Sequence, residues 1–235
     1  MNHRICNAKL QTYLSTLDEK EREYVTKIAD NTIFISTERM VEKVRNGLNK
    51  FKADNPKYNL YVPSGKIGSE HYLLLQLKDE LHPIEVIYGS QKVNNDYPVL
   101  IVDDAIYSST NICGHIDTLR YETGMKNKFV VVVAVISSQN VSLVEDSEYF
   151  QAEVIADMEL SHLLPERLFD DYDFDYFFKH FGCETECMVP LIFEHKIANE
   201  FGTYQFYHEI VGEPVSRAVI DIITQEDVQA FISSF

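Results

Sequence analysis

Two near-continuous apolar runs constrain the fold of this 235-residue chain more than any other feature. They are VLIV at 99–102 and FVVVVAVI at 129–136, and neither alternates between apolar and polar residues as a half-exposed strand does. Runs of this kind are typical of strands that are buried on both faces. Because such strands occur in parallel sheets covered by helices, the sequence predicts an α/β fold.

Helical and strand-like segments alternate along the middle of the chain. Besides the two apolar runs, the strand-like segments are 58–63, 84–88 and 152–157, and the amphipathic helical segments are 36–51, 69–81 and 110–124. This alternation predicts a parallel sheet with helices on both faces, formed by a core at 57–158. We expect 1–56 to be a helical lead-in without a sheet, and 159–235 to be an α+β elaboration packed on the core.

The composition excludes several classes of function. The formal net charge of −16 argues against broad non-specific binding to nucleic acid or to anionic membranes. The first residues lack the apolar segment of a signal peptide, and the longest apolar run is too short to span a bilayer. Four irregularly spaced cysteines fit reduced thiols. We therefore expect a cytoplasmic protein that makes no membrane contact.

Two adjacent carboxylates, Asp103 and Asp104, follow the first apolar run directly. Burying them beside the run would be costly without cations or hydrogen-bond donors, so we expect the strand to end where the charges begin. Both carboxylates would then stand at the carboxyl edge of the sheet, where open α/β folds bind ligands.

A hydroxyl-rich stretch, Ser108, Ser109 and Thr110, leads from these carboxylates into the next predicted helix. Backbone N–H groups at a helix start can bind a phosphate, and the three hydroxyls can assist them. The preceding aspartates can accept hydrogen bonds from ribose hydroxyls, directly or through a hydrated Mg²⁺.

Residues 99–111 resemble the phosphoribosyl pyrophosphate (PRPP) motif of type I phosphoribosyltransferases, and the resemblance extends over roughly 58–136. It implies a parallel α/β fold that binds Mg²⁺ and PRPP, in which a nitrogen nucleophile displaces pyrophosphate from ribose C1. By this resemblance, Asp103 and Asp104 hold the ribose hydroxyls and the metal. The residues that hold the 5′-phosphate are Ser108, Ser109, Thr110 and Asn111.

A second stretch, VPSGKIGSEHYLL at 62–74, occupies the place of the family's pyrophosphate loop. Ser64, Gly65 and Lys66 match that loop in position and kind, as a turn that offers backbone donors and a cation to the leaving group. Taken alone, Gly65 and Gly68 indicate only a turn between a strand and a helix. The aspartate pair one βαβ unit later favours the functional interpretation.

The sequence also departs from the family's pattern. A threonine-glycine pair followed by a threonine is usual in the phosphate loop, whereas the stretch 108–111 contains no glycine. Tyr107 stands where purine-salvage members place an acidic residue, and we group it with the substrate-binding residues. These departures favour a catalytically degenerate sensor or scaffold that binds PRPP or a nucleotide. The intact aspartates and Lys66 favour a transferase, so both alternatives stay open.

The whole chain looks like a narrower group, the phosphoribosyltransferase-like proteins of bacterial antiphage conflict systems, including some retrons. NTIFISTERMVEKV at 31–44 and VPLIFEHKIANEFGTY at 189–204 carry this resemblance. It implies an effector or regulator with a protein partner from the same defence system, and it leaves a homo-oligomer open.

Three other clusters have a plainer alternative. His180, Cys183 and Cys187 could bind zinc but lack a fourth ligand, and buried thiols are the default. The acidic stretch at 170–175 lacks the glycine and distal glutamate of a calcium loop, which favours a solvated segment. A triplet at 194–196 could close over a substrate or form a solvated strand end; its residues are Glu194, His195 and Lys196.

Overall fold

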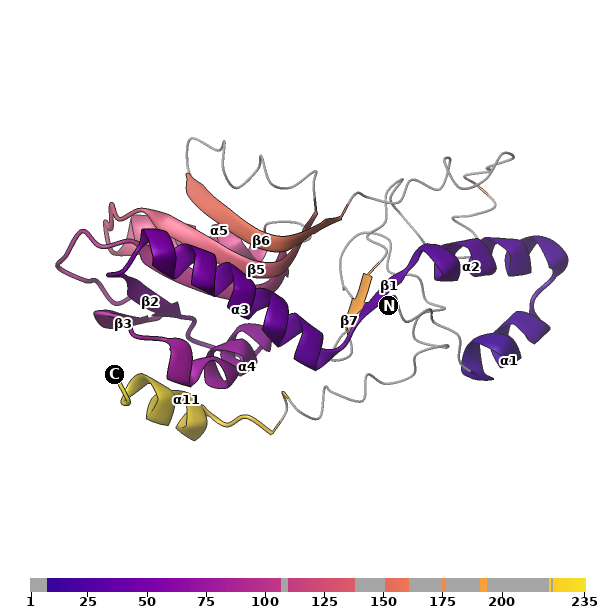
Figure 1. Cartoon of the computed structure of the whole chain (residues 1–235), viewed down its shortest axis with the longest axis horizontal. Helices are drawn as coiled ribbons and strands as arrows, with labels where there is room; N and C mark the ends of the chain where they lie inside the picture. Colours follow the sequence, from indigo (N-terminus) through magenta and orange to yellow (C-terminus); the bar gives the residue numbers. More distant parts are fainter. Residues whose placement is uncertain are drawn as a thin grey trace. The chain divides into compact units, whose positions relative to one another are not determined.

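The computed structural model describes residues 8–106, 110–137, 151–160, 175, 191–193, 220 and 222–235 (Figure 1). The chain divides into two compact units, each assembled from separated stretches of sequence. The first unit is Met1–Thr37 with Ser161–Val219, and the second is Glu38–Leu160 with Ile220–Phe235. The three-part division at residues 56 and 158 stays a prediction.

The first unit begins with two helices, α1 (Ala8–Thr16) and α2 (Glu19–Asn31). Asp18 caps α2, because its Oδ1 accepts from the Glu21 N–H at 2.8 Å while the Glu21 carboxylate accepts from the Asp18 N–H at 3.1 Å. The short strand β1 (Ile33–Ile35) follows and pairs in parallel with β7 (Leu191–Phe193).

Strand β1 corrects the prediction of a helical lead-in without a sheet. Three residues are too few to show an alternating pattern. The pairing partner of Ile33–Ile35 lies in the last quarter of the chain, so no local feature of the sequence reports it.

The second unit is built on a five-stranded sheet in which every pairing is parallel. Its order is β3-β2-β4-β5-β6. The strands are β2 (Asn59–Val62), β3 (Glu85–Tyr88), β4 (Val99–Ile106), β5 (Phe129–Ser137) and β6 (Ala152–Leu160). The predicted α/β fold with a parallel sheet is confirmed.

Helices cover both faces of this sheet. They are α3 (Thr37–Asp54), α4 (Ser69–Gln76), α5 (Thr110–Asp117) and α11 (Gln225–Ile232), with a 3₁₀ turn η1 (Lys78–Glu80) and a π turn η2 (Thr118–Glu122). Ile112 and Ile116 of α5 pack in one buried cluster with Val131 of β5. The neighbouring Val132 faces α3, which crosses the sheet in Figure 1. A Cβ on Gly47 would lie 2.8 Å from Val132 Cγ1, so α3 approaches the sheet as closely as glycine allows.

Several element bounds differ from the sequence prediction. Strand β4 does not end at Val102 but continues through both aspartates to Ile106, with Asp103 opposite Val133 in register. The strand ladder is made by backbone groups, so a charged side chain does not end it. Strand β6 also extends beyond 152–157.

The helix ends agree better with the glycine and capping residues in the sequence. The predicted helix at 69–81 ends at Gln76 and continues as η1, and the one at 110–124 changes to η2 after Asp117. Gly124 stops the latter at a φ of +68°, as predicted. Thr224 caps α11, also as predicted, because its hydroxyl accepts from the Asp227 N–H.

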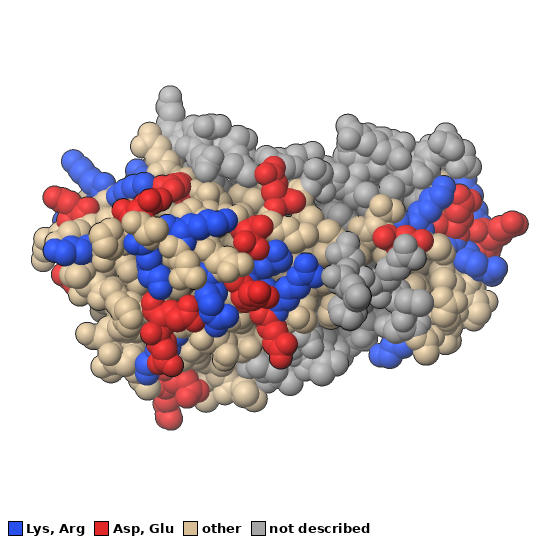
Figure 2. All heavy atoms as spheres, in the orientation of Figure 1, with Lys and Arg blue, Asp and Glu red and all other residues tan. Residues whose placement is uncertain are grey.

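Charges of opposite sign are interspersed on the surface that carries α3. Figure 2 shows basic and acidic side chains of the described residues side by side on this face. Lys43 pairs with Asp157 at 2.8 Å, and Arg45 pairs with Glu80 at 2.7 Å. Among the described residues, no helix has both the length and the apolar character that crossing a membrane requires.

Candidate functional site

The strand order places a topological switch point between β2 and β4. From β2 the chain passes through α4 to β3 on one side of β2, and then returns to β4 on the other side. In open parallel sheets, ligands bind in the crevice beyond the carboxyl ends of the strands at such a point. The loop 63–68 follows β2, and Asp103 and Asp104 lie in the second half of β4. The fold therefore brings these two predicted parts of the site to one edge.

The loop 63–68 presents Ser64, Gly65 and Lys66 to solvent. Gly65 has a φ of +115°, which residues with a side chain rarely adopt. Among the described residues other than Gly65 and its chain neighbours, no atom lies within 4 Å of a Cβ built on it. The carbonyl of Gly65 accepts a 2.9 Å hydrogen bond from Gln225 Nε2 of α11. Gly89, after β3, comes close enough that a Cβ on it would lie 2.7 Å from Ser64 Oγ. The loop is thus supported from two elements while its tip faces open space.

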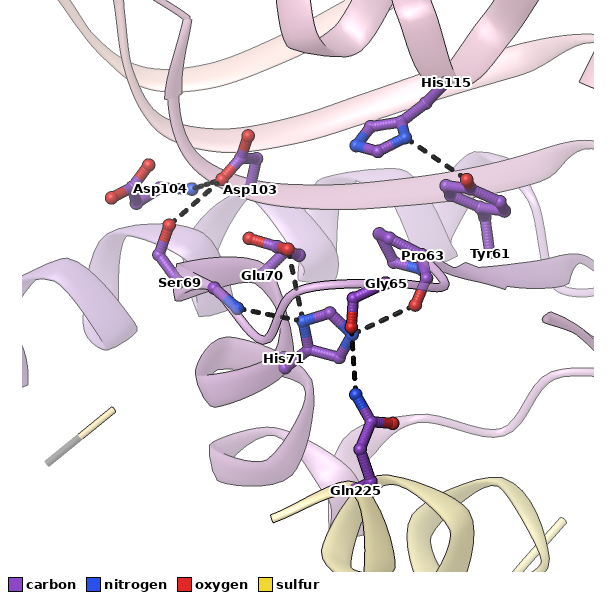
Figure 3. Close-up of polar contacts among 11 residues, drawn as sticks. Tyr61, Pro63, Gly65, Ser69, Glu70, His71, Asp103, Asp104, His115 and Gln225 are labelled. Carbon is purple, nitrogen blue, oxygen red and sulfur yellow. Dashed lines mark hydrogen bonds and ion pairs between the residues drawn. The ribbon is translucent and has the colours of Figure 1, made fainter. Parts of the chain in front are cut away.

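Helix α4 connects this loop to β4. Ser69, the first residue of α4, donates from its hydroxyl to Asp103 Oδ1 at 3.5 Å, a long hydrogen bond (Figure 3). The same Asp103 oxygen accepts from the Asp104 N–H at 2.8 Å. The end of the loop and the first aspartate are therefore held next to each other.

The two aspartates have different environments. Successive side chains of a strand point to opposite faces, and Figure 3 shows Asp103 and Asp104 diverging from β4. Asp104 has 0% of its surface exposed, whereas Asp103 is half-buried. Asp103 is the carboxylate that faces the start of α4. The shared role of both aspartates in holding ribose and metal stays a prediction.

The donor set at this edge suits a hydrated Mg²⁺ that is shared with phosphate oxygens. Mg²⁺ in phosphate sites takes one or two carboxylates and keeps several waters. Asp103 supplies one half-buried carboxylate to such a site. Over the part of the chain that the structure describes, no group of three His, Cys, Asp or Glu side chains is arranged to hold a metal alone.

The predicted phosphate-loop residues are only partly described. Tyr107, Ser108 and Ser109 lie outside the described residues. Thr110 begins α5, and Asn111 is exposed in the first turn of that helix, directly after β4. Their contacts with a 5′-phosphate stay predictions. The candidates at 170–175, 180–187 and 194–196 also lie outside the described residues, except Asp175.

Four residues near the loop were missed by the sequence reasoning: Tyr61, Glu70, His71 and His115. Tyr61 Oη lies 3.2 Å from His115 Nδ1, and Glu70 Oε1 lies 3.1 Å from His71 Nδ1. His71 is 2% exposed, and its Nε2–H donates to the Pro63 carbonyl at 3.0 Å. The pattern SEHYLLL indicates an amphipathic helix, and this pattern does not distinguish a functional histidine from one that packs among leucines.

Burial and Glu70 set the protonation of this group. Burial raises the pKa of Tyr61 to about 12, and the charge of Glu70 adds to the shift. Burial lowers the pKa of His115, which therefore stays neutral at pH 7. Burial also acts to lower the pKa of His71, but the hydrogen bond and charge of Glu70 outweigh it and hold that pKa above its ordinary value. The two histidines thus titrate in different ranges.

Comparison with known proteins gives a structural likeness but no match in sequence. No protein-family model matches the sequence, and no curated protein matches it. Among solved structures, the chain is similar to the xanthine-guanine-hypoxanthine phosphoribosyltransferase of Helicobacter pylori. The two share 12% sequence identity with a TM-score of 0.36, over 55% of this chain and 83% of that chain. Likeness at this level does not establish a family, so the fold assignment rests on the order and register of the sheet itself.

Proposed function

We propose that this protein binds PRPP or a nucleotide, together with Mg²⁺, at the edge between β2 and β4 and transfers a phosphoribosyl group. One observation carries the proposal. A loop with an open Gly65 and an exposed Lys66 is joined through Ser69 to Asp103, at the switch point of a parallel sheet. A ligand with two phosphate clusters on either side of a ribose would use a cationic loop, a carboxylate and a helix start at one edge of the sheet.

Each group has a role that follows from its charge and position. Lys66 and the backbone amides of the loop would neutralise a pyrophosphate as the C1 bond breaks. Asp103 would accept hydrogen bonds from the ribose hydroxyls and stabilise positive charge that develops on the ring. The start of α5, with Thr110 and Asn111, would bind the 5′-phosphate. A bound Mg²⁺ would add charge neutralisation at the pyrophosphate oxygens.

We further propose that the protein acts in a bacterial antiphage defence system, in the cytoplasm and with a protein partner from that system. The resemblance of 31–44 and 189–204 to proteins of such systems supports this proposal. Ile33–Ile35 and Leu191–Phe193 belong to these two segments and pair with each other as β1 and β7. Three described residues of each segment are therefore neighbours in the structure.

A sensor or scaffold that binds the ligand without turnover is the second candidate. The complete burial of Asp104 favours it, because one half-buried carboxylate, Asp103, then remains to face a ligand. The absence of glycine from 108–111 favours it as well.

Calorimetry followed by a turnover assay separates the two candidates. The protein is titrated with PRPP and with nucleoside monophosphates, each with and without Mg²⁺, and pyrophosphate release is then measured with bases and amines as acceptors. A transferase binds PRPP in a Mg²⁺-dependent way and releases pyrophosphate. Binding without release under every acceptor condition supports the sensor, and the absence of any binding contradicts both.

A further inference from the structure

One imidazole ring joins the two ends of the loop 63–68. His71 Nε2–H donates to the Pro63 carbonyl at 3.0 Å, and the Gly68 N–H donates to His71 Nδ1 at 3.2 Å (Figure 3). Pro63 begins the loop and Gly68 ends it, directly before α4. Since the ring is 2% exposed, it is held in place by packing as well as by these bonds. The conformation that presents Gly65 and Lys66 is therefore framed by this one side chain.

A third group competes for the same ring nitrogen. Glu70 Oε1 lies 3.1 Å from His71 Nδ1, the atom that also faces the Gly68 N–H. A neutral ring that donates from Nε2 has only a lone pair on Nδ1, so it accepts from Gly68 and cannot donate to Glu70. A protonated ring donates from both nitrogens, so it satisfies Pro63 and Glu70 and cannot accept from Gly68. Each protonation state satisfies two of the three partners.

The position of Glu70 depends on Gly68, the residue with which it competes for His71 Nδ1. A Cβ built on Gly68 would collide with both carboxylate oxygens of Glu70. The backbone of Gly68 is extended, with φ −132° and ψ −168°, a conformation that any residue adopts. Glycine matters at this position because it has no Cβ to collide with Glu70. The Glu70 side chain is 19% exposed and lies against the ring. The loop end is thus built to bring a carboxylate beside His71.

We propose that His71 is a positioning residue for the loop 63–68, and that its protonation transfers Nδ1 from the Gly68 N–H to Glu70. The Gly68 N–H then becomes available to a phosphate group bound at the loop. Proton binding at His71 and phosphate binding at the loop favour each other, because linkage between two sites is reciprocal. The identity of the ligand rests on the proposed function, whereas the exchange of partners at Nδ1 does not.

Two titratable groups among the described residues interact with the ring. Glu70 is its neighbour on α4, and His115 of α5 interacts with both of them. Helix α11 packs on α4 and carries Glu226 and Asp227 in its first turn. Glu70 holds the pKa of His71 above its ordinary value, so the exchange occurs at a higher pH than the titration of an ordinary histidine.

The exchange is tested directly on the full-length protein by NMR. Ring nitrogen shifts report the protonation of His71, and the Gly68 amide shift and its hydrogen exchange report the bond to Nδ1. We expect the Gly68 signals to change with the same midpoint as the ring. In Glu70→Gln, which keeps the size and removes the charge, both midpoints move to lower pH. A Gly68 amide that does not respond when His71 titrates overturns the proposal.

The consequence for the loop is tested with inorganic pyrophosphate as the probe, by calorimetry across the same pH range. We expect at least ~5-fold tighter binding to the wild type below the His71 midpoint than above it, relative to His71→Gln at each pH. Comparison at equal pH removes the ionisation of pyrophosphate itself. Glu226→Gln, which removes one charge from α11, is the matched control and should keep the wild-type profile.

The two experiments separate the inference from the proposed function. A wild-type protein that binds no pyrophosphate at any pH overturns the proposed function of the loop, and the NMR titration still decides the role of His71. Pyrophosphate binding with the same pH profile in the wild type and in His71→Gln overturns the inference and leaves the proposed function standing.

Discussion

Lys66 is an exposed cation beside an open glycine, at the tip of a loop that α4 and α11 support. A charge in this position acts on a leaving group that becomes more negative as its bond breaks, and it does little for a monophosphate. We expect Lys66→Ala to reduce the rate of pyrophosphate release by about 100-fold or more, the scale observed when one preorganised donor to developing charge is removed. Binding of a nucleoside monophosphate, measured by calorimetry, should change much less.

Lys126 provides the matched control for Lys66. It is also an exposed lysine, but it precedes β5 and therefore lies at the amino edge of the sheet, opposite the candidate site. Lys126→Ala should retain full turnover. An equal loss of turnover in both variants would show that net charge, and not the loop, determines the rate.

Asp103 and Asp104 should respond differently to neutralisation, because one is half-buried beside Ser69 and the other has no exposed surface. We expect Asp103→Asn to weaken Mg²⁺-dependent binding of PRPP at least ~10-fold, since hydrogen bonds to charged groups are worth about 1.5–3 kcal/mol. Calorimetry with and without Mg²⁺ measures the loss, and circular dichroism checks the fold. If Asp103→Asn binds PRPP with wild-type affinity, Asp103 does not contact the ligand.

A salt bridge joins α3 to β6 in the second unit. Lys43 Nζ lies 2.8 Å from Asp157 Oδ2, with side chains that are 12% and 22% exposed. The hydrogen bond from Lys43 lowers the pKa of Asp157 below its ordinary value. A carboxylate with a lowered pKa stabilises the folded state above its unfolded-state pKa, and this stabilisation is lost as the pH falls through the folded-state pKa.

We therefore expect Lys43→Met to lower the free energy of unfolding by about 1 kcal/mol at pH 7, the upper range for pairs with some exposure. As the pH falls from the ordinary pKa of aspartate through the lowered pKa of folded Asp157, the difference between wild type and variant should shrink, because a protonated Asp157 no longer attracts Lys43. Urea titrations at several pH values measure this. The control is Lys128→Met, which removes an exposed pair with Glu153 and should cost about 0.5 kcal/mol or less at any pH. A difference that is independent of pH would assign the effect of Lys43 to packing.

The sequence predicted the elements of the sheet well, because continuous apolar runs and amphipathic helices are local patterns. It predicted their ends less well, since β4 continues through Asp103 on backbone hydrogen bonds alone. Strand β1 could not be predicted, because its three residues pair with β7 across most of the chain. Pairings of this kind depend on the whole fold and leave no local pattern.

The candidate site was predicted in part for the same reason. Turn chemistry identifies Gly65, and the position of Asp103 after an apolar run places it near the same edge. His71 was missed because the pattern of α4 describes an apolar stripe. Gln225 was missed because 160 residues separate it from Gly65, the residue whose carbonyl accepts its hydrogen bond. Long-range contacts such as this one require the structure.

At the scale of the whole molecule, the second unit is completed by the end of the chain. Ile220–Phe235 belongs to the same compact unit as Glu38–Leu160, and within it α11 packs on α4. Val228 and Phe231 are each 2% exposed, and the ring of Phe231 meets that of Phe235 edge-on at 5.2 Å. The helix that covers α4 also supplies the hydrogen bond to the candidate loop, so stability and the site depend on the same element.

Removal of residues 220–235 should therefore lower both the stability and the ligand affinity of the protein. Burial of side chains such as Val228 and Phe231 contributes about 1.5–3 kcal/mol each, so we expect the free energy of unfolding to fall by about 3–6 kcal/mol. Gln225→Ala separates the two effects, because this exposed side chain contributes a bond to the loop and no core packing. It should retain the urea midpoint and weaken pyrophosphate binding, whereas Phe231→Ala should lower the midpoint. If the shortened chain unfolds at the wild-type urea concentration, α11 is not part of the cooperative unit, and its bond to Gly65 cannot hold the loop.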